Sequence, residues 1–224
     1  MREIVLDIET TGLKVEDGDK IVEIGCVEVI DRKLTGVNFH HLIDPGKAVS
    51  KDTTEITGIC DADLKGKPKF EDIADDLLDF ISDNQVIAHN SNFDIGFINA
   101  ELSGIGKPII KNTIIDTLYL ARAKFPGKKN SLDALCERYN IDSTKREKHG
   151  ALIDAELLVE VYLRLTEDAS LNFFGDANEI KIMDIEELKK QIQLNQRIDR
   201  KFFVDDEELR LHNEFMEKNV NKRI

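Results

Sequence analysis

Four acidic residues lie in or beside apolar stretches of the chain, and this placement constrains the fold more than any other feature. They are Asp7 and Glu9 in VLDIETTG, Asp94 in HNSNFDIGF and Asp154 in HGALIDAELL. Moving an ionised carboxylate out of water costs several kcal/mol unless it is paired, protonated or bound to a metal. Because these three segments contain no lysine or arginine, we expect a fold that brings the four carboxylates to divalent cations.

The first three acids can be placed on predicted elements. In a strand over residues 2–8, Asp7 and Glu9 project to the same side because residues two apart share a face. A solvated sheet edge is the alternative, but apolar residues alternate with both acids and indicate burial. Asp94 lies near the start of a predicted helix, where a carboxylate favours the helix dipole. It also shares a helix face with Phe97 and Ile98, which points it inward.

The fourth acid comes with a histidine. Asp154 has Leu158 and Val161 at helical spacing and therefore faces the core. His149 precedes it by five residues, in a loop that can place the imidazole over the same site. A single histidine is often structural. This one, flanked by glycine and close to a core-facing aspartate, is a candidate general base with a pKa near working pH.

Crowding four carboxylates requires positive charge. Two like charges about 4 Å apart repel by roughly 4 kcal/mol at an effective dielectric near 20. Two Mg²⁺ or Mn²⁺ ions resolve this repulsion in enzymes that hydrolyse phosphodiesters, and ligand sets made only of oxygen favour these hard ions over zinc. The acids therefore predict a site for two such cations.

The remaining pattern predicts an α/β fold with a mixed five-stranded sheet flanked by helices. The first three strands form a meander, after which helices and strands alternate. Strands are predicted at 2–8, 21–30, 36–43, 85–88 and 113–116, and helices at 70–81, 92–103, 117–124, 131–139 and 150–165.

Charge and composition exclude some classes of function. The net charge of −13 argues against a protein that grips nucleic acid over its whole surface. An enzyme that touches only a strand end, held there by a partner, remains compatible. The basic cluster at 145–148 is either solvated loop charge or a phosphate contact, and its position before His149 favours the second. The chain has no apolar run long enough for a membrane span, and its three scattered cysteines indicate a reducing cytoplasm.

The chain divides into three parts. Residues 1–166 are predicted to form the catalytic domain, because apolar density and periodicity fall off after Thr166. Residues 167–200 read as a polar linker. Residues 201–224 regain amphipathic spacing, at Phe203, Leu209 and Phe215, and are predicted to be an interaction tail.

The segments DIETTG, HNSNFD and HGALID, in that order, resemble the motifs of the DEDDh exonucleases. The resemblance implies an RNase H-like fold and removal of nucleotides from 3′ ends with two Mg²⁺ or Mn²⁺ ions. It implies that Asp7, Glu9, Asp94 and Asp154 are metal ligands and that His149 accepts the proton of the attacking water.

Within that family, residues 1–166 resemble the proofreading exonucleases of bacterial replicative polymerases, which act on DNA 3′ ends. The resemblance places substrate contacts near Thr57, where many relatives have histidine. The implied substrate-binding residues are Asp7, Glu9, Thr10, Asp52, Thr57 and Asp154.

The resemblance also implies protein partners. Residues 201–224 resemble a segment that binds the polymerase subunit, and some relatives carry a small accessory subunit on the outer surface of the sheet. Residues 168–173 resemble a peptide that binds the sliding clamp, with Asp168 in place of the usual glutamine; a hydrophobic start to the linker is the alternative. Two other functions remain open: a free-standing DEDDh ribonuclease, and a non-catalytic subunit that stabilises its polymerase.

Overall fold

The computed structural model of the chain describes residues 1–144, 146 and 148–172, with the backbone alone for 168–172. These residues belong to the first of two compact units into which the chain divides. None of the helices in this part of the chain is long and apolar enough to cross a membrane. The predicted linker beyond residue 172 and the predicted tail lie outside the described residues.

A five-stranded mixed sheet forms the centre of the fold, in the order β3-β2-β1-β4-β5. The first three strands form the predicted antiparallel meander, and β4 and β5 run parallel to β1. The strands are β1 (Arg2–Thr10), β2 (Ile21–Ile30), β3 (Lys33–Leu42), β4 (Gln85–Ala88) and β5 (Ile114–Asp116).

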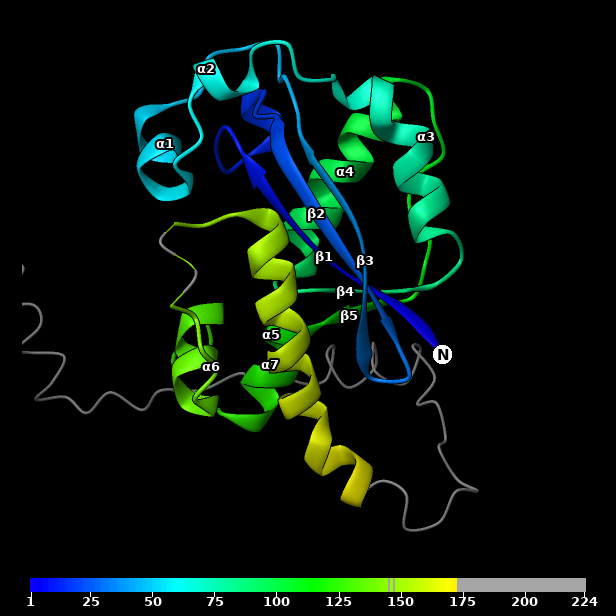
Figure 1. Ribbon diagram of the computed structural model, residues 1–224, viewed down its shortest axis with the longest axis vertical. Helices are drawn as coiled ribbons and strands as arrows, with labels where there is room; N and C mark the ends of the chain where they lie inside the picture. The colour runs from blue at the N-terminus through cyan, green and yellow to red at the C-terminus, as the bar shows by residue number, and fades with distance from the viewer. Residues whose placement is uncertain (145, 147, 173–224) are drawn as a thin grey trace, which may run out of the picture. The chain divides into compact units, whose positions relative to one another are not determined.

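Helices cover both faces of this sheet, as Figure 1 shows. The alternation of β1 assigns each face: Ile4, Leu6 and Ile8 pack in the core beside α3 and α4, whereas Val5 packs in the core beside α6 and α7. Asp7 and Glu9 have the parity of Val5 and therefore project on the α7 side. The helices are α3 (Phe70–Ile81), α4 (Ser91–Gly104), α5 (Thr117–Lys124), α6 (Leu132–Tyr139) and α7 (Ala151–Asn172).

Two short α-helices were not predicted, and neither was the 3-10 helix η1 (Val15–Asp17). Helix α1 (Lys51–Thr57) begins at Ser50, whose hydroxyl accepts a hydrogen bond from the amide of Thr53 at 3.0 Å. It ends at Gly58, whose φ of 80° is readily adopted only by glycine. Helix α2 (Asp61–Leu64) follows. Both are too short and too polar to show a helical apolar stripe.

Two element boundaries differ from prediction by more than two residues. Strand β3 begins at Lys33, because Asp31 and Arg32 form the preceding turn with φ values of 50° and 65°. Helix α7 continues to Asn172 rather than ending near Leu165. Most of the predicted clamp-binding peptide at 168–173 therefore belongs to this helix, and Phe173 lies outside the described residues.

Candidate active site

The acidic side chains from three distant segments line one hollow of about 230 Å³. It lies where β1, the start of α4 and the start of α7 meet. Its lining includes all four acids singled out in the sequence together with the histidine: Asp7, Glu9, Asp94, His149 and Asp154.

Strand β1 supplies the first two carboxylates. Asp7 and Glu9 are both partly buried and alternate with the buried Ile8, which keeps them on one face. Each is fixed in register by an antiparallel partner on β2: Asp7 pairs with Gly25 and Glu9 pairs with Glu23. The central position of β1 in the sheet therefore holds these two side chains firmly.

Asp94 enters from the first turn of α4 and is 3% exposed. Its carboxylate accepts hydrogen bonds from its own backbone and from the backbone of Ile8. The latter contact ties the start of α4 to β1, between the two acids of that strand. A buried position at the start of a helix, rather than a solvated one, is the arrangement that the sequence favoured.

Asp154 lies in the first turn of α7 and its side chain is 4% exposed. His149 precedes the helix, and its Nδ1 lies 3.3 Å from Oδ2 of Asp154. Its imidazole is almost half exposed, so solvent reaches it. Glu9, His149 and Asp154 each offer a ligand atom, and these three atoms lie within 4.8 Å of one another.

The hollow raises the pKa of three of its acids, Asp7, Glu9 and Asp94. Burial raises the pKa of Asp7 well above its usual range, and the nearby charges of Asp94, Glu9 and Asp154 raise it further. Burial and the charge of Asp154 raise the pKa of Glu9 to about 7. Burial also raises the pKa of Asp94, and the backbone hydrogen bonds only partly oppose this effect. Ionising all of these acids together would therefore give the site more negative charge than the protein neutralises.

One basic residue does reach the site, from outside the three apolar segments. Arg146 forms ion pairs with Asp133 of α6 and with Asp154, where its Nη2 donates to Oδ2 at 2.6 Å. Its Nη2 also lies 2.6 Å from Nδ1 of His149. The sequence placed this arginine in a basic cluster aimed at phosphate, and its pairing with acids was missed. Its place three residues before His149 was the available signal.

The donor set fits hard divalent cations. It consists of carboxylate oxygens and one imidazole, and burial together with the charges of neighbouring acids raises the pKa of Asp7 and Glu9. Among the described residues, Oδ1 of Asp154 is buried and accepts no hydrogen bond, although Nε of Arg146 lies against it. The guanidinium of Arg146 therefore occupies a position beside Asp154 for which a bound metal ion would compete.

The three remaining sequence-predicted site residues lie outside the acidic hollow. Thr10 is buried and donates its hydroxyl to the carbonyl of Gly12 at 2.5 Å. Asp52 is exposed in the first turn of α1. Thr57, at the end of α1, lines a neighbouring hollow of about 530 Å³, and His149 lies on the wall shared by the two hollows. The hollow lined by Thr57 therefore adjoins the acidic hollow at His149.

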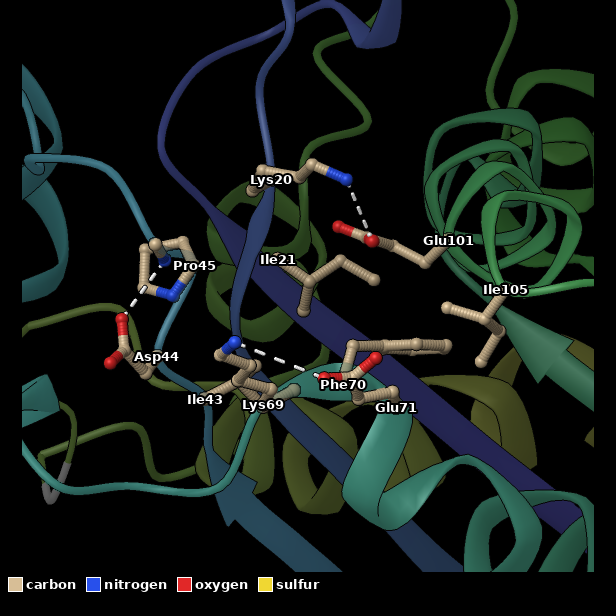
Figure 2. Close-up of a pocket in the computed structure, with 11 residues that line it drawn as sticks. Lys20, Ile21, Ile43, Asp44, Pro45, Lys69, Phe70, Glu71, Glu101 and Ile105 are labelled. Atoms are coloured by element: carbon tan, nitrogen blue, oxygen red, sulfur yellow. Dashed lines mark hydrogen bonds and ion pairs between the residues drawn. The ribbon is translucent and has the colours of Figure 1, made fainter.

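A third hollow, of about 240 Å³, has a different character (Figure 2). Both lysines there are paired with acids: Lys20 contacts Glu101 at 2.8 Å, and Lys69 lies 3.9 Å from Glu71. The remaining acid, Asp44, accepts a hydrogen bond from the backbone N–H of Gly46 at 2.9 Å. Opposite charges satisfy one another there, whereas like charges gather in the acidic hollow. The acidic hollow is therefore the candidate active site.

Comparison with known proteins relates the chain to exonucleases. A family model described as an exonuclease matches residues 4–162. A DNA polymerase III subunit epsilon from Rickettsia felis is 51% identical over 170 residues, which are 74% of each chain. The subunit of the same name from Escherichia coli is 43% identical over 219 residues, covering 94% of this chain and 90% of the relative.

Solved exonuclease structures share the fold. Exonuclease X, solved in complex with 5′ overhanging duplex DNA, is 27% identical, with a TM-score of 0.61 over 75% of this chain and 93% of that chain. A 3′-exonuclease solved with a histone mRNA stem-loop has a TM-score of 0.65 at 16% identity, over 75% of this chain and 64% of that chain. These likenesses confirm the predicted mixed sheet flanked by helices.

Proposed function

The chain belongs to the RNase T family of exonucleases, and from that premise we propose that it is the proofreading 3′→5′ exonuclease of a bacterial replicative DNA polymerase. It removes mispaired nucleotides from DNA 3′ ends as nucleoside 5′-monophosphates. The observation that carries this proposal is the convergence of four carboxylates and an imidazole from three segments on one hollow. The relatives named DNA polymerase III subunit epsilon, matched over most of the chain, support the polymerase assignment.

Exonucleases of this kind use divalent metal ions. We assign the binding of two Mg²⁺ or Mn²⁺ ions to Asp7, Glu9, Asp94 and Asp154. When bound, such ions neutralise the developing negative charge on the phosphate and make the attacking water more acidic. The protein contributes a rigid frame for them, since Asp7 and Glu9 lie on a central strand.

His149 is assigned the role of general base. Hydrogen bonding to Asp154 raises the pKa of this imidazole, and the positive charge of Arg146 acts against that effect. The exposed edge of the ring can take a proton from a water molecule in the hollow, while Asp154 stabilises the imidazolium that forms. The proton then leaves to solvent through the half-exposed side of the ring.

Selection of mispaired ends requires no reading of sequence. A strand end must leave its duplex to enter a hollow of this size, and a mispaired end separates at lower cost than a paired one. Thr10, Asp52 and Thr57 are proposed to contact the separated strand along the path between the two adjoining hollows. Thr57 lines the neighbouring hollow, which supports its place in this set.

The relatives' name implies association with a DNA polymerase III complex, and the individual partners are proposals. We assign binding of the polymerase alpha subunit to residues 201–224, weak binding of the sliding clamp to 168–173, and an accessory subunit to the outer surface of the sheet. The thiols of Cys26, Cys60 and Cys136 are free, which supports the proposed location in the cytoplasm.

Excision of a mispaired primer tests the function. With Mg²⁺ or Mn²⁺, the full chain should release the mispaired terminal nucleotide faster than a paired one, as a 5′-monophosphate. Asp7→Asn removes one proposed ligand without changing side-chain size and should abolish release. Equal release by the two proteins would contradict the proposal.

A further inference from the structure

Glu23 on β2 contacts the start of the helix that carries Asp154. Its side chain is buried, and both carboxylate oxygens have partners. Oε2 accepts a hydrogen bond from the backbone N–H of Ala151, the first residue of α7, at 3.0 Å. Oε1 lies 2.7 Å from Nε2 of His40 on β3. The first N–H groups of a helix have no partner within the helix, and negative charge is favoured there. Glu23 thus caps α7 from another element.

A second contact on β2 fixes the same helix turn. A Cβ built on Gly25 would lie 2.3 Å from the backbone N of Leu152 and 2.4 Å from the backbone C of Ala151. The first turn of α7 therefore rests directly on the backbone of β2. Gly25 and Glu23 are two residues apart and share a strand face. The start of α7 therefore contacts the same face of β2 at two neighbouring positions.

These two positions on β2 are also the partners of the acids on β1. Gly25 pairs with Asp7, and Glu23 pairs with Glu9. Strand β2 therefore sets the distance between the carboxylates of β1 and the carboxylate of Asp154, because it contacts both β1 and the start of α7. Further support of the loop before α7 comes from α1, where the carbonyl of Ile56 accepts a hydrogen bond from the N–H of His149 at 3.2 Å.

We propose that Glu23 is a positioning residue of the nuclease site. By capping α7, Glu23 keeps the side chains of Asp154 and the adjoining His149 close enough to Glu9 for all three to act in one site. This inference rests on the proposed function. The capping contact itself is a property of the metal-free protein and can be measured without substrate.

Three variants of the full chain test the inference. Glu23→Ala removes the acceptor. Glu23→Gln replaces the carboxylate with an amide, whose oxygen can still accept the hydrogen bond from the N–H of Ala151. Glu28→Gln is a matched control on the same strand, because Glu28 contacts Arg2 at 2.5 Å and Thr35 at 2.8 Å rather than the start of α7.

We expect Glu23→Ala to lower kcat for excision at least about tenfold with little change in KM, because misplacing catalytic groups by a fraction of an ångström slows the chemical step. Amide hydrogen exchange at Ala151 should accelerate, and Mn²⁺ should bind more weakly. Glu23→Gln should restore kcat to within about threefold of the unmodified chain, as the conservative replacement retains the cap. Glu28→Gln should match the unmodified chain in all three measurements.

An unchanged kcat and unchanged exchange at Ala151 in Glu23→Ala would overturn the inference, as would a loss of kcat that Glu23→Gln does not recover. If Glu23→Ala does not fold, Glu23→Met, which keeps the side-chain volume without an acceptor, takes its place. If the unmodified chain releases no nucleotides, the proposed function fails. The exchange and Mn²⁺ measurements then decide separately whether Glu23 positions α7.

Discussion

At the scale of single residues, Glu9 shows most directly what crowding does to an acid. Its pKa of about 7, against an ordinary value of 4.5, arises from burial and from the charge of Asp154. A shift of this size corresponds to about 3 kcal/mol of unfavourable ionisation in the metal-free protein. Cations that bind Glu9 would remove this cost.

This shift predicts an unusual dependence of stability on pH. Because the pKa of Glu9 is raised on folding, the folded protein binds the proton more tightly than the unfolded chain. The stabilisation from that proton is complete below pH 4.5 and is lost as the pH rises through about 7. Thermal unfolding in EDTA should therefore show a melting temperature that falls across this window, and saturating Mn²⁺ should suppress the fall.

Glu9→Gln is the control for this titration, since it keeps the size of the side chain and removes the charge. Its melting temperature in EDTA should fall less over the same window and should exceed that of the unmodified chain above pH 7. An equal fall in both proteins would show that Glu9 does not carry the effect. Asp7 and Asp94, whose pKa values are also raised, account for the fall in melting temperature that remains in Glu9→Gln.

Residues of the site differ in how far the sequence predicted their place. Asp7 and Glu9 were placed by the two-residue period of a strand, and Asp154 by the helical period of its apolar neighbours. Arg146 could not be placed, because it lies in a loop and one of its partners, Asp133, belongs to another helix. The role of Glu23 could not be predicted either, because a glutamate within a strand does not indicate which helix terminus it caps.

At the scale of elements, the packing of α7 on β2 determines whether the site can assemble. Gly25→Ala would introduce a Cβ atom that overlaps the backbone of Ala151 and Leu152. Because neither backbone can move without displacing the helix, we expect a loss of about 1–3 kcal/mol of stability. Excision should slow as well, since Asp154 moves with the helix. Chemical denaturation and the primer assay would measure the two effects.

Gly96→Ala is the matched control for stability. Gly96 lies within α4, and a Cβ there would meet nothing within 4 Å. Replacing a helical glycine with alanine stabilises a helix by about 0.5–1 kcal/mol. Opposite signs for the two glycines would support the packing described, and a neutral Gly25→Ala would contradict it.

Strongly periodic elements were predicted well and short polar ones were not. Helix α3 matched its predicted bounds because Ile73, Leu77 and Ile81 mark its buried face. Helix α1 buries only Thr53 and Thr57, so it left no apolar stripe to detect. Its position depends on contacts with distant segments, such as the bond from the hydroxyl of Thr53 to the carbonyl of Thr11 at 3.1 Å.

At the scale of the whole molecule, nuclease activity and polymerase binding are assigned to different parts of the chain. The site is built within residues 1–172, and the proposed polymerase contact lies at 201–224. A chain ending at Asn172, where α7 ends, should therefore keep excision activity and fail to co-purify with the polymerase subunit. Primer digestion and pull-down would measure these properties side by side.

Full-length Asp7→Asn supplies the reverse case, because it should bind the polymerase and release no nucleotides. Polymerase binding by the shortened chain would refute the assignment to the tail. Failure of the full-length chain to bind would instead favour a free-standing nuclease. The net charge of −13 makes such a partner useful, since the chain has little general attraction for DNA.

Acids from three segments are proposed to share divalent ions. Titration with Mn²⁺ tests this sharing most directly, with binding monitored by calorimetry or by the electron paramagnetic resonance signal of unbound Mn²⁺. The unmodified chain should bind two ions, and Asp7→Asn, which lacks one carboxylate of the cluster, should bind fewer or bind them at least about tenfold more weakly. Identical Mn²⁺ binding by the two proteins would contradict the account, because the ions would then lie away from the carboxylates that β1, α4 and α7 bring together.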